Sequence, residues 1–324
     1  MSAIVLQAVL QVAQLILPLL LLIWLAVRPA RGWLAYTLQV IAVAGTLTGL
    51  WLTAIWAMPP FWVPYGLLGI FLTVLVFQFF GLRRESTAPW DTGILATLLI
   101  LVISVSGCLG LYVTVRAWQG TRIPAVPTVD ISAPFPSGTY LIANGGSTTA
   151  VNNHLQTLDP TVPRFSDFRG QSRALDIFRI SSLGIHVEGW RPEDPGRYLT
   201  FAAPLTAPCD GTVARVVDGV PDNRVPRMNR EQMAGNYVAI DCGGFFLILA
   251  HLRLGSVQVR EGQQVAIGDA LGQMGNSGNS SEPHLHIHAQ RGLPDGSPLG
   301  GEPLALTIDG RFLVRNDRFT VTGR

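Results

Sequence analysis

Three histidines, His284, His286 and His288, lie in the run PHLHIH in the last fifth of the chain. Successive side chains of a β-strand point to opposite faces, so the three imidazoles share one face and the two apolar side chains share the other. Imidazole nitrogens are common zinc ligands, and a cluster of them suits a metal site. The alternative is the polar, solvent-facing edge of an amphipathic strand.

A fourth histidine, His251, strengthens the metal-site interpretation. It follows the apolar run FFLIL, at the end of a candidate strand, where a lone histidine is usually structural. The segment 275–281 is a turn rich in Gly, Asn and Ser that leads directly into the histidine run. Because the chain has only six histidines, finding four of them in these two segments favours metal and acid–base chemistry.

Short apolar segments broken by Gly, Asn and Asp predict the elements that position these histidines. From Thr139 onward, turn signals recur at short spacing and no long helical period appears. The expected strands are Thr212–Val217, Tyr237–Cys242, Phe245–Leu252, Val257–Val259 and His284–His288. We therefore expect residues 139–324 to form one domain that is mainly antiparallel β.

Five motifs in this domain resemble one known family. They are APCDGTV, GNYVAIDCGG, LILAHL, VREGQQVAIGDALGQMGNSG and PHLHIH, in that order between about Ala203 and Gln290. Their order and glycine punctuation are similar to those of lysostaphin-type (LytM-like, peptidase M23) zinc metallopeptidases. The resemblance implies the lysostaphin-type fold, one Zn²⁺ per chain, and hydrolysis of peptide bonds of peptidoglycan by a zinc-activated water.

The resemblance also implies roles for individual residues. In the family, zinc is held by the His and the Asp of an H-x-x-x-D motif and by the second His of H-x-H. Matched by motif, Asp176 and His286 are expected to be metal ligands, and His251 and His284 the two catalytic imidazoles.

The first ligand of the family pattern is missing from this sequence. The residue four positions before Asp176 is Ser172, a poor zinc ligand, and Gln171 is no better. The nearest upstream imidazole is His154, which we expect to complete the site from a preceding loop. Otherwise His154 is a surface residue, and the domain is an inactive module that binds cell wall or regulates other wall hydrolases.

The two remaining histidines have no expected catalytic role, and the absence of lysine excludes several classes of site. We expect His186 to be structural and His288 to be a satisfied edge residue, with a place behind the metal ligands as the alternative. All 23 basic residues are Arg, which excludes a P-loop lysine, a Schiff-base lysine and a lipoyl attachment site. The helical zinc motif H-E-x-x-H is absent, so no glutamate base is available in that pattern.

Four apolar runs dominate residues 1–116. Each is about 20 residues or longer, the length that crosses a hydrocarbon core of ~30 Å. The runs are Ile4–Val27, Trp33–Met58, Phe61–Phe80 and Gly93–Val115. They predict an all-α bundle of four transmembrane helices in a lipid bilayer, and because no His or acidic residue lies within a run, the bundle is expected to be an anchor. Recognition of a lipid or a partner is the alternative.

Loop charges predict the orientation of this bundle. The first loop carries Arg28 and Arg31, the third carries Arg83 and Arg84, and the second carries no charge. The positive-inside rule places the first and third loops in the cytoplasm. We therefore expect an integral protein of the cytoplasmic (inner) membrane, with both termini outside and an extracytoplasmic, periplasmic catalytic domain.

Composition and cysteine content complete the expectations. A net charge of +2 gives no case for a nucleic-acid partner. Residues 117–138 are rich in proline and are expected to be an extended spacer between membrane and domain. Cys209 and Cys242 flank a predicted hairpin, so a disulfide between them is one reading, and two free buried thiols is the other.

Overall fold

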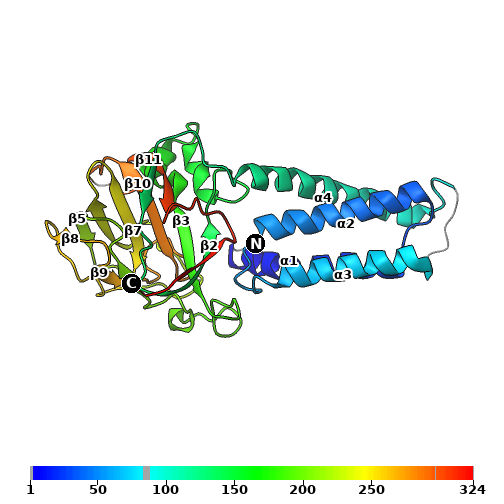
Figure 1. Ribbon diagram of the computed structural model, residues 1–324, viewed down its shortest axis with the longest axis horizontal. Helices are drawn as coiled ribbons and strands as arrows, with labels where there is room; N and C mark the ends of the chain where they lie inside the picture. The colour runs from blue at the N-terminus through cyan, green and yellow to red at the C-terminus, as the bar shows by residue number, and fades with distance from the viewer. Residues whose placement is uncertain (1–2, 83–87, 296, 324) are drawn as a thin grey trace. The chain divides into compact units, whose positions relative to one another are not determined.

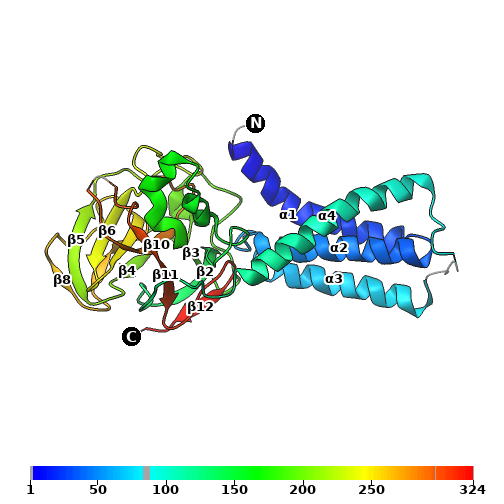
Figure 2. The same ribbon diagram turned by 90° about the horizontal axis from the view of Figure 1, so that it is seen from above.

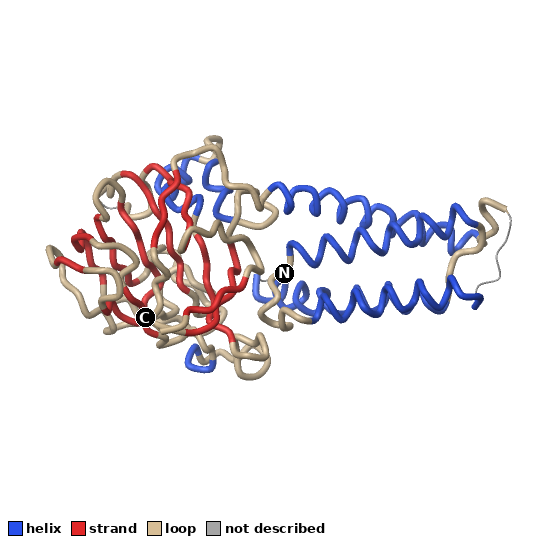
Figure 3. The backbone as a smooth tube through the Cα atoms, viewed as in Figure 1, coloured by secondary structure: helices blue, strands red, loops and turns tan. Residues whose placement is uncertain are grey.

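The chain folds into two compact units, Met1–Trp118 and Gln119–Arg324. The structure is a computed structural model and describes residues 3–82, 88–295 and 297–323. The long helices belong to the first unit, and among the described residues every strand belongs to the second (Figure 3). Arg83 and Arg84, on which the predicted orientation partly depends, lie outside the described residues.

Within its described residues, the first unit contains four α-helices (Figure 1). They are α1 (Ala3–Val27), α2 (Trp33–Thr53), α3 (Val63–Phe77, continued by the π-helix Gln78–Leu82) and α4 (Ile94–Gln119). Three segments are long and apolar enough to cross a membrane, namely Trp33–Thr53, Val63–Phe80 and Ile94–Gln119, whereas Val12–Val27 of α1 counts as a shorter apolar helix. A bundle of four transmembrane helices therefore stays a prediction.

Glycines bring α2 and α4 into close contact, where Figure 2 shows the two helices crossing. A Cβ on Gly45 of α2 would lie 2.5 Å from the carbonyl oxygen of Gly107 in α4, and one on Gly110 would overlap the carbonyl oxygen of Gly45. Thr46 donates to the Ser106 hydroxyl across the same contact, at 3.2 Å. Small residues that let two backbones approach are the usual helix–helix contact of apolar helices in lipid.

The second unit is built on one sheet of ten strands with the order β12-β2-β3-β10-β7-β6-β5-β8, in which β11 pairs with β10 and β1 pairs with β11 (Figure 1). The β1–β11 pair is parallel and every other described pair is antiparallel. The strands of this sheet are β1 (Thr128–Ile131), β2 (Gly138–Asn144), β3 (Leu175–Ile180), β5 (Gly211–Val217), β6 (Asn236–Asp241), β7 (Phe246–Leu252), β8 (Gln264–Val265), β10 (Leu285–Arg291), β11 (Glu302–Ile308) and β12 (Arg318–Val321). The short strands β4 (Pro204–Thr206) and β9 (Ala270–Gln273) pair separately.

The mainly antiparallel β fold expected for this unit is confirmed, although several of its strands, β3 among them, were not among the strands expected from the sequence. Val257–Val259 is not a strand. Thr128–Ile131, inside the stretch expected to be a spacer, is strand β1. Its sequence TVDI has β-branched residues at three of four positions, and such residues favour a pleated conformation. The secondary structure of the second unit thus begins within the proline-rich segment.

Alternation along the central strands gives the sheet two different faces. Leu285 and Ile287 of β10 belong to the main hydrophobic core, together with Leu247 and Leu249 of β7. The other face carries a smaller apolar cluster and, on β10, the histidines. We call this second face the site face. Cys209 and Cys242 form a disulfide, and both pack against the main hydrophobic core on the opposite face.

Candidate metal centre

Asp176 and His286 are direct neighbours across two antiparallel strands. Asp176 is the second residue of β3, and the register pairs it with His286 of β10. Directly paired residues point to the same face with Cβ atoms about 5 Å apart. His286 Nδ1 accordingly lies 3.1 Å from Asp176 Oδ1, with both side chains buried.

His154 reaches the same carboxylate from a separate segment. It lies in the 3₁₀-helix η2 (Asn153–Leu158), for which Asn152 is the N-cap. The Asn152 amide nitrogen donates to the carbonyl oxygens of Ala174 and Gly146, so its Oδ1 is the acceptor for the ring nitrogen Nδ1 of His154 at 3.1 Å. The lone pair of His154 is then on Nε2, 3.5 Å from Asp176 Oδ2.

His251 reaches the site through a bulge in strand β7. The β6–β7 register pairs Asn236 with Leu252 and Tyr237 with Ala250, which leaves His251 as the extra residue. Its φ is +64°, a left-handed conformation that is unusual for a non-glycine residue. Strict alternation would point His251 into the core, and the bulge instead turns it towards the site. Its Nδ1 lies 2.8 Å from the carbonyl oxygen of Ser277, which leaves Nε2 unprotonated in the neutral ring.

His284 stands beside His251 and is held in the same way. Its Nδ1 donates to the carbonyl oxygen of Glu282 at 2.8 Å, so the lone pair is on Nε2. That Nε2 lies 3.6 Å from Asp176 Oδ1. The two ring centroids of His251 and His284 are 4.9 Å apart. Both imidazoles therefore present an Nε2 acceptor beside the carboxylate.

Burial and mutual charge keep these groups in complementary protonation states. Burial alone would raise the pKa of Asp176, but His154, His284 and His286 hold the pKa of this carboxyl well below its usual range. Burial lowers the pKa of His154 to about 4, although Asp176 opposes the shift. Burial and the neighbouring His284 and His286 also lower the pKa of His251 well below the usual value. An ionised carboxylate and neutral imidazoles are the states that ligate a metal.

The donor set of His154, Asp176 and His286 fits a zinc ion. One ligand atom from each residue lies within 4.8 Å of the others. The separations of 3.5 Å and 3.1 Å from the carboxylate oxygens to the two imidazole nitrogens are close to the roughly 3.3 Å between ligand atoms around tetrahedral zinc with bonds of ~2.0–2.1 Å. Two histidines and one carboxylate also form a known ligand set of catalytic zinc.

Two residues behind Asp176 were not anticipated from the sequence. The Asn144 amide donates to Asp176 Oδ2 at 2.8 Å, and Arg315 donates to Asn144 Oδ1 at 2.6 Å. Arg315 also donates to the backbone carbonyls of Ala143 and Ala150. This arrangement orients the carboxylate towards the histidines. No local motif marks Asn144 or Arg315, because each meets Asp176 only through long-range packing.

The two histidines without an assigned role are both buried. His186 Nε2 lies 3.1 Å from Glu282 Oε2, and the His186 ring stacks on Phe178 at 4.8 Å. His288 lies between His286 and Gln290, with 3.1 Å separating the bonded atoms on each side. His288 is thus not at a solvent-facing edge, because β7 and β3 cover both sides of β10.

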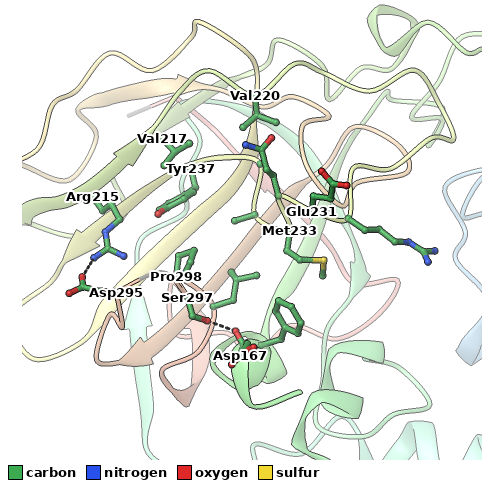
Figure 4. Close-up of a pocket in the computed structure, with 16 residues that line it drawn as sticks. Asp167, Arg215, Val217, Val220, Glu231, Met233, Tyr237, Asp295, Ser297 and Pro298 are labelled. Carbon is green, nitrogen blue, oxygen red and sulfur yellow. Dashed lines mark hydrogen bonds and ion pairs between the residues drawn. The ribbon is translucent and has the colours of Figure 1, made fainter. Parts of the chain in front are cut away.

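A cavity of about 690 Å³ opens on the site face, and none of the site histidines lines it. Tyr237 and Arg215 line it, and Figure 4 shows the ion pair of Arg215 with Asp295 at its margin, at 2.8 Å. The register runs from Tyr237 through Ala250 to His286, so Tyr237 is two strands, roughly 10 Å, from His286. The cavity and the histidines therefore share one face of the sheet.

Comparison with known proteins gives the family of this unit. Residues 199–299 match the sequence model of Peptidase family M23. This match includes His251, His284 and His286, whereas His154 and Asp176 precede it.

Among curated proteins, the chain is similar to the peptidoglycan DD-endopeptidase ShyA of Vibrio cholerae serotype O1. The two are 32% identical over 121 residues, which is 36% of this chain and 28% of ShyA. The chain thus spans less than a third of that relative's length.

Solved structures of similar proteins cover only part of the chain. A zinc-containing peptidase from Vibrio cholerae is 27% identical, with a TM-score of 0.22, over 28% of this chain and 24% of that one. A putative peptidase M23 from Pseudomonas aeruginosa is also 27% identical, with a TM-score of 0.22, over 32% and 40%. By their sequence, residues 199–299 are thus a region of peptidase family M23, of the lysostaphin-type, LytM-like kind.

Proposed function

We propose that this M23 peptidase is a membrane-anchored zinc metalloendopeptidase that hydrolyses peptide bonds of peptidoglycan. The observation that carries the proposal is the convergence of five side chains on one point. His154 Nε2, Asp176 and His286 Nδ1 surround it as ligands, and His251 and His284 present two further nitrogens. His154, Asp176 and His286 would hold one zinc ion per chain.

A bound zinc ion would lower the pKa of a water molecule towards about 7 and polarise the scissile carbonyl. The protein supplies the proton transfers. Backbone carbonyls hold the Nδ1 protons of His251 and His284, which leaves each Nε2 able to take a proton from the attacking water. Once protonated, the same nitrogen can donate to the oxyanion or to the leaving amine. The two imidazoles lie close enough to share these roles.

The substrate class is inferred from the relative and from the shape of the site face. ShyA is named a peptidoglycan DD-endopeptidase. The site face carries a cavity two strands away from His286, and an extended peptide can lie across strands in this way. Charged side chains at the cavity, among them Arg215 and Glu231, can contact the charged groups of a wall peptide.

The localisation follows from the apolar helices. Segments Trp33–Thr53, Val63–Phe80 and Ile94–Gln119 are the candidate spans, and α1 would be the fourth. Arg28 and Arg31 in the first loop favour a cytoplasmic loop and an extracytoplasmic peptidase unit. A reporter active only in the periplasm, fused after Arg324, should be active. A reporter that is active only in the cytoplasm would contradict this orientation.

The experiment for the activity uses full-length protein in detergent. Wild type, His284→Ala and His251→Ala are incubated with purified peptidoglycan, released muropeptides are measured, and zinc is quantified in each sample. We expect release to fall at least ~100-fold in both variants while zinc is retained, since neither residue is a ligand. A Gln264→Ala variant on exposed β8 is the control. Wild type that carries zinc but releases nothing would favour an inactive wall-binding or regulatory module.

A further inference from the structure

A row of polar side chains continues inward from His286 along the site face of β10. His286 Nε2 is 3.1 Å from His288 Nδ1, and His288 Nε2 is 3.1 Å from Gln290 Oε1. All three side chains are buried, and they occupy alternate positions of one strand. Buried polar groups that pair with one another at this depth form a connected network rather than a solvated edge.

The direction of these hydrogen bonds is fixed at the Gln290 end. The Gln290 amide nitrogen donates to the carbonyl oxygens of Gly292 at 2.8 Å and Pro298 at 3.1 Å. Carbonyls only accept, so the nitrogen of the amide must face them. Gly301 N–H donates to Gln290 Oε1 from the other side, at 3.3 Å. Gln290 Oε1 is therefore the acceptor that faces His288.

This polarity is transmitted to His286. Because Gln290 Oε1 accepts, His288 Nε2 carries the proton of the neutral ring and His288 Nδ1 is an acceptor. His286 Nε2 then carries a proton and donates to His288. The lone pair of His286 is left on Nδ1, the atom that lies 3.1 Å from Asp176 Oδ1. Two acceptors that face each other at this distance repel, and a cation between them removes the repulsion.

We propose that His288 and Gln290 are positioning residues that fix His286 as its Nε2–H tautomer and thereby raise the affinity of the site for zinc. The proposal rests on the metal site put forward above. Hydrogen-bond partners of metal-ligating histidines typically contribute 10–100-fold in metal affinity. Here the partner is a second histidine anchored by an amide to two backbone carbonyls.

Packing around Gln290 is consistent with a fixed orientation of its amide. Gly170, in the 3₁₀-helix η3 (Pro163–Arg173), lies against it so closely that a Cβ at Gly170 would overlap Gln290 Oε1. A Cβ at Gly301 would lie 2.7 Å from the Gln290 amide carbon. The two glycines thus leave the space that the Gln290 amide occupies, which a larger residue at either position would fill.

The test measures zinc affinity of full-length protein in detergent by competition with a chelator. The variants are His288→Phe, which keeps an aromatic ring without nitrogens, and Gln290→Leu, which removes the acceptor. Gln264→Leu on β8 is the matched control. We expect zinc binding to weaken 10–100-fold in His288→Phe and in Gln290→Leu, and less than ~2-fold in the control. Equal zinc affinity in the wild type, His288→Phe and Gln290→Leu would refute the positioning role.

A second readout needs no variant that alters folding. In zinc-loaded wild type labelled with ¹⁵N-histidine, long-range ¹H–¹⁵N spectra report which ring nitrogen carries the proton. We expect His288 as the Nε2–H tautomer, and an Nδ1–H tautomer would overturn the proposal even if His288→Phe does not fold. Wild type that takes up no zinc would instead overturn the proposed metal site itself, and with it the positioning role of His288 and Gln290.

Discussion

His154 Nε2 lies 3.5 Å from Asp176 Oδ2, although the family spacing H-x-x-x-D places a serine, Ser172, four residues before this aspartate. Ser172 is buried, and its hydroxyl bonds to Thr157 Oγ1 at 2.8 Å and to the carbonyl oxygen of Arg169. Thr157 in turn donates to the carbonyl oxygen of His154 at 2.8 Å. The residue at the family's ligand position thus supports the short helix that carries the replacement imidazole.

This relationship predicts effects of very different size on zinc binding for two substitutions. His154→Ala removes a proposed ligand and should weaken zinc binding by at least ~100-fold, because the remaining donors are only Asp176 and His286. Ser172→Ala removes a hydroxyl whose partners are Thr157 and the Arg169 carbonyl, and should change zinc binding less than ~10-fold. Chelator competition on both full-length variants checks this. Zinc loss in Ser172→Ala alone would show that the serine, or a water that it holds, is the ligand.

Acid should destabilise the zinc-free protein. Burial, together with His286, lowers the pKa of His154 from 6.5 to about 4, with Asp176 opposing. Between these two pH values the unfolded chain binds a proton at His154 and the folded chain does not, so stability is complete above pH 6.5 and decreases as the pH falls towards 4. The contribution of this one histidine is on the order of 3 kcal/mol.

Urea unfolding of the zinc-free protein at several pH values measures this dependence. His154→Phe should have a flatter profile between pH 6.5 and 4 than the wild type. His251 and His288 have lowered pKa values as well, so part of the dependence remains in this variant. A wild-type stability that increases on acidification over this range would contradict the neutral state of these imidazoles.

The sequence predicted two of the strands that carry the site, β7 and β10, but neither β3 nor the path of the chain between the strands. Of the run PHLHIH, the last four residues lie on β10 with alternating faces, and His284 immediately precedes the strand. Asp176, which the motif match selects, lies opposite His286 in the β3–β10 register. The sequence could not predict the face of the sheet to which the His251 side chain points. A bulge and a positive φ at His251 reverse the face that alternation predicts. The approach of His154 depends on a 3₁₀-turn, which leaves no periodic signal.

Other differences from the expectation arise where the outcome depends on contacts with distant segments. Val257–Val259 has strand-like residues, but the Val257 N–H donates to the Asp218 carboxylate, and only the Gln258 N–H donates to strand β9, at the carbonyl oxygen of Leu271. Thr128–Ile131 was hidden between prolines, and only the parallel partner β11, far along the chain, makes it a strand. Asn144 and Arg315 were missed because their role appears only once β2 and the segment before β12 lie together. Long-range pairing is the information that a single sequence does not carry.

The disulfide between Cys209 and Cys242 should contribute measurably to stability. The two cysteines are 33 residues apart and close a loop that contains β5 and β6. Loop-closure entropy predicts a stabilisation of about 3–4 kcal/mol for a loop of this length. The double variant Cys209→Ser/Cys242→Ser should have a lower urea midpoint than the full-length wild type. Addition of a thiol reducing agent should lower the midpoint of the wild type in the same way. The double variant itself should not respond to the reducing agent, and an identical midpoint in both proteins would contradict the prediction.

The contact between α2 and α4 should tolerate no large side chain at Gly110. A Cβ there would overlap the carbonyl oxygen of Gly45, and the remaining atoms of an isoleucine would push the two helices apart. Loss of close packing between apolar helices removes the dispersion contacts that hold them together in lipid.

Gly69 of α3 is the matched position, because nothing within the described residues lies within 4 Å of a Cβ built there. We expect Gly110→Ile to destabilise the full-length protein by a few kcal/mol or more and Gly69→Ile by less than ~1 kcal/mol, since isoleucine is also the better helix former of the two residues. Thermal unfolding in detergent, followed by circular dichroism at the helix band, compares the two variants. Equal melting of Gly110→Ile and Gly69→Ile would mean that the glycine contact between α2 and α4 does not hold these helices together.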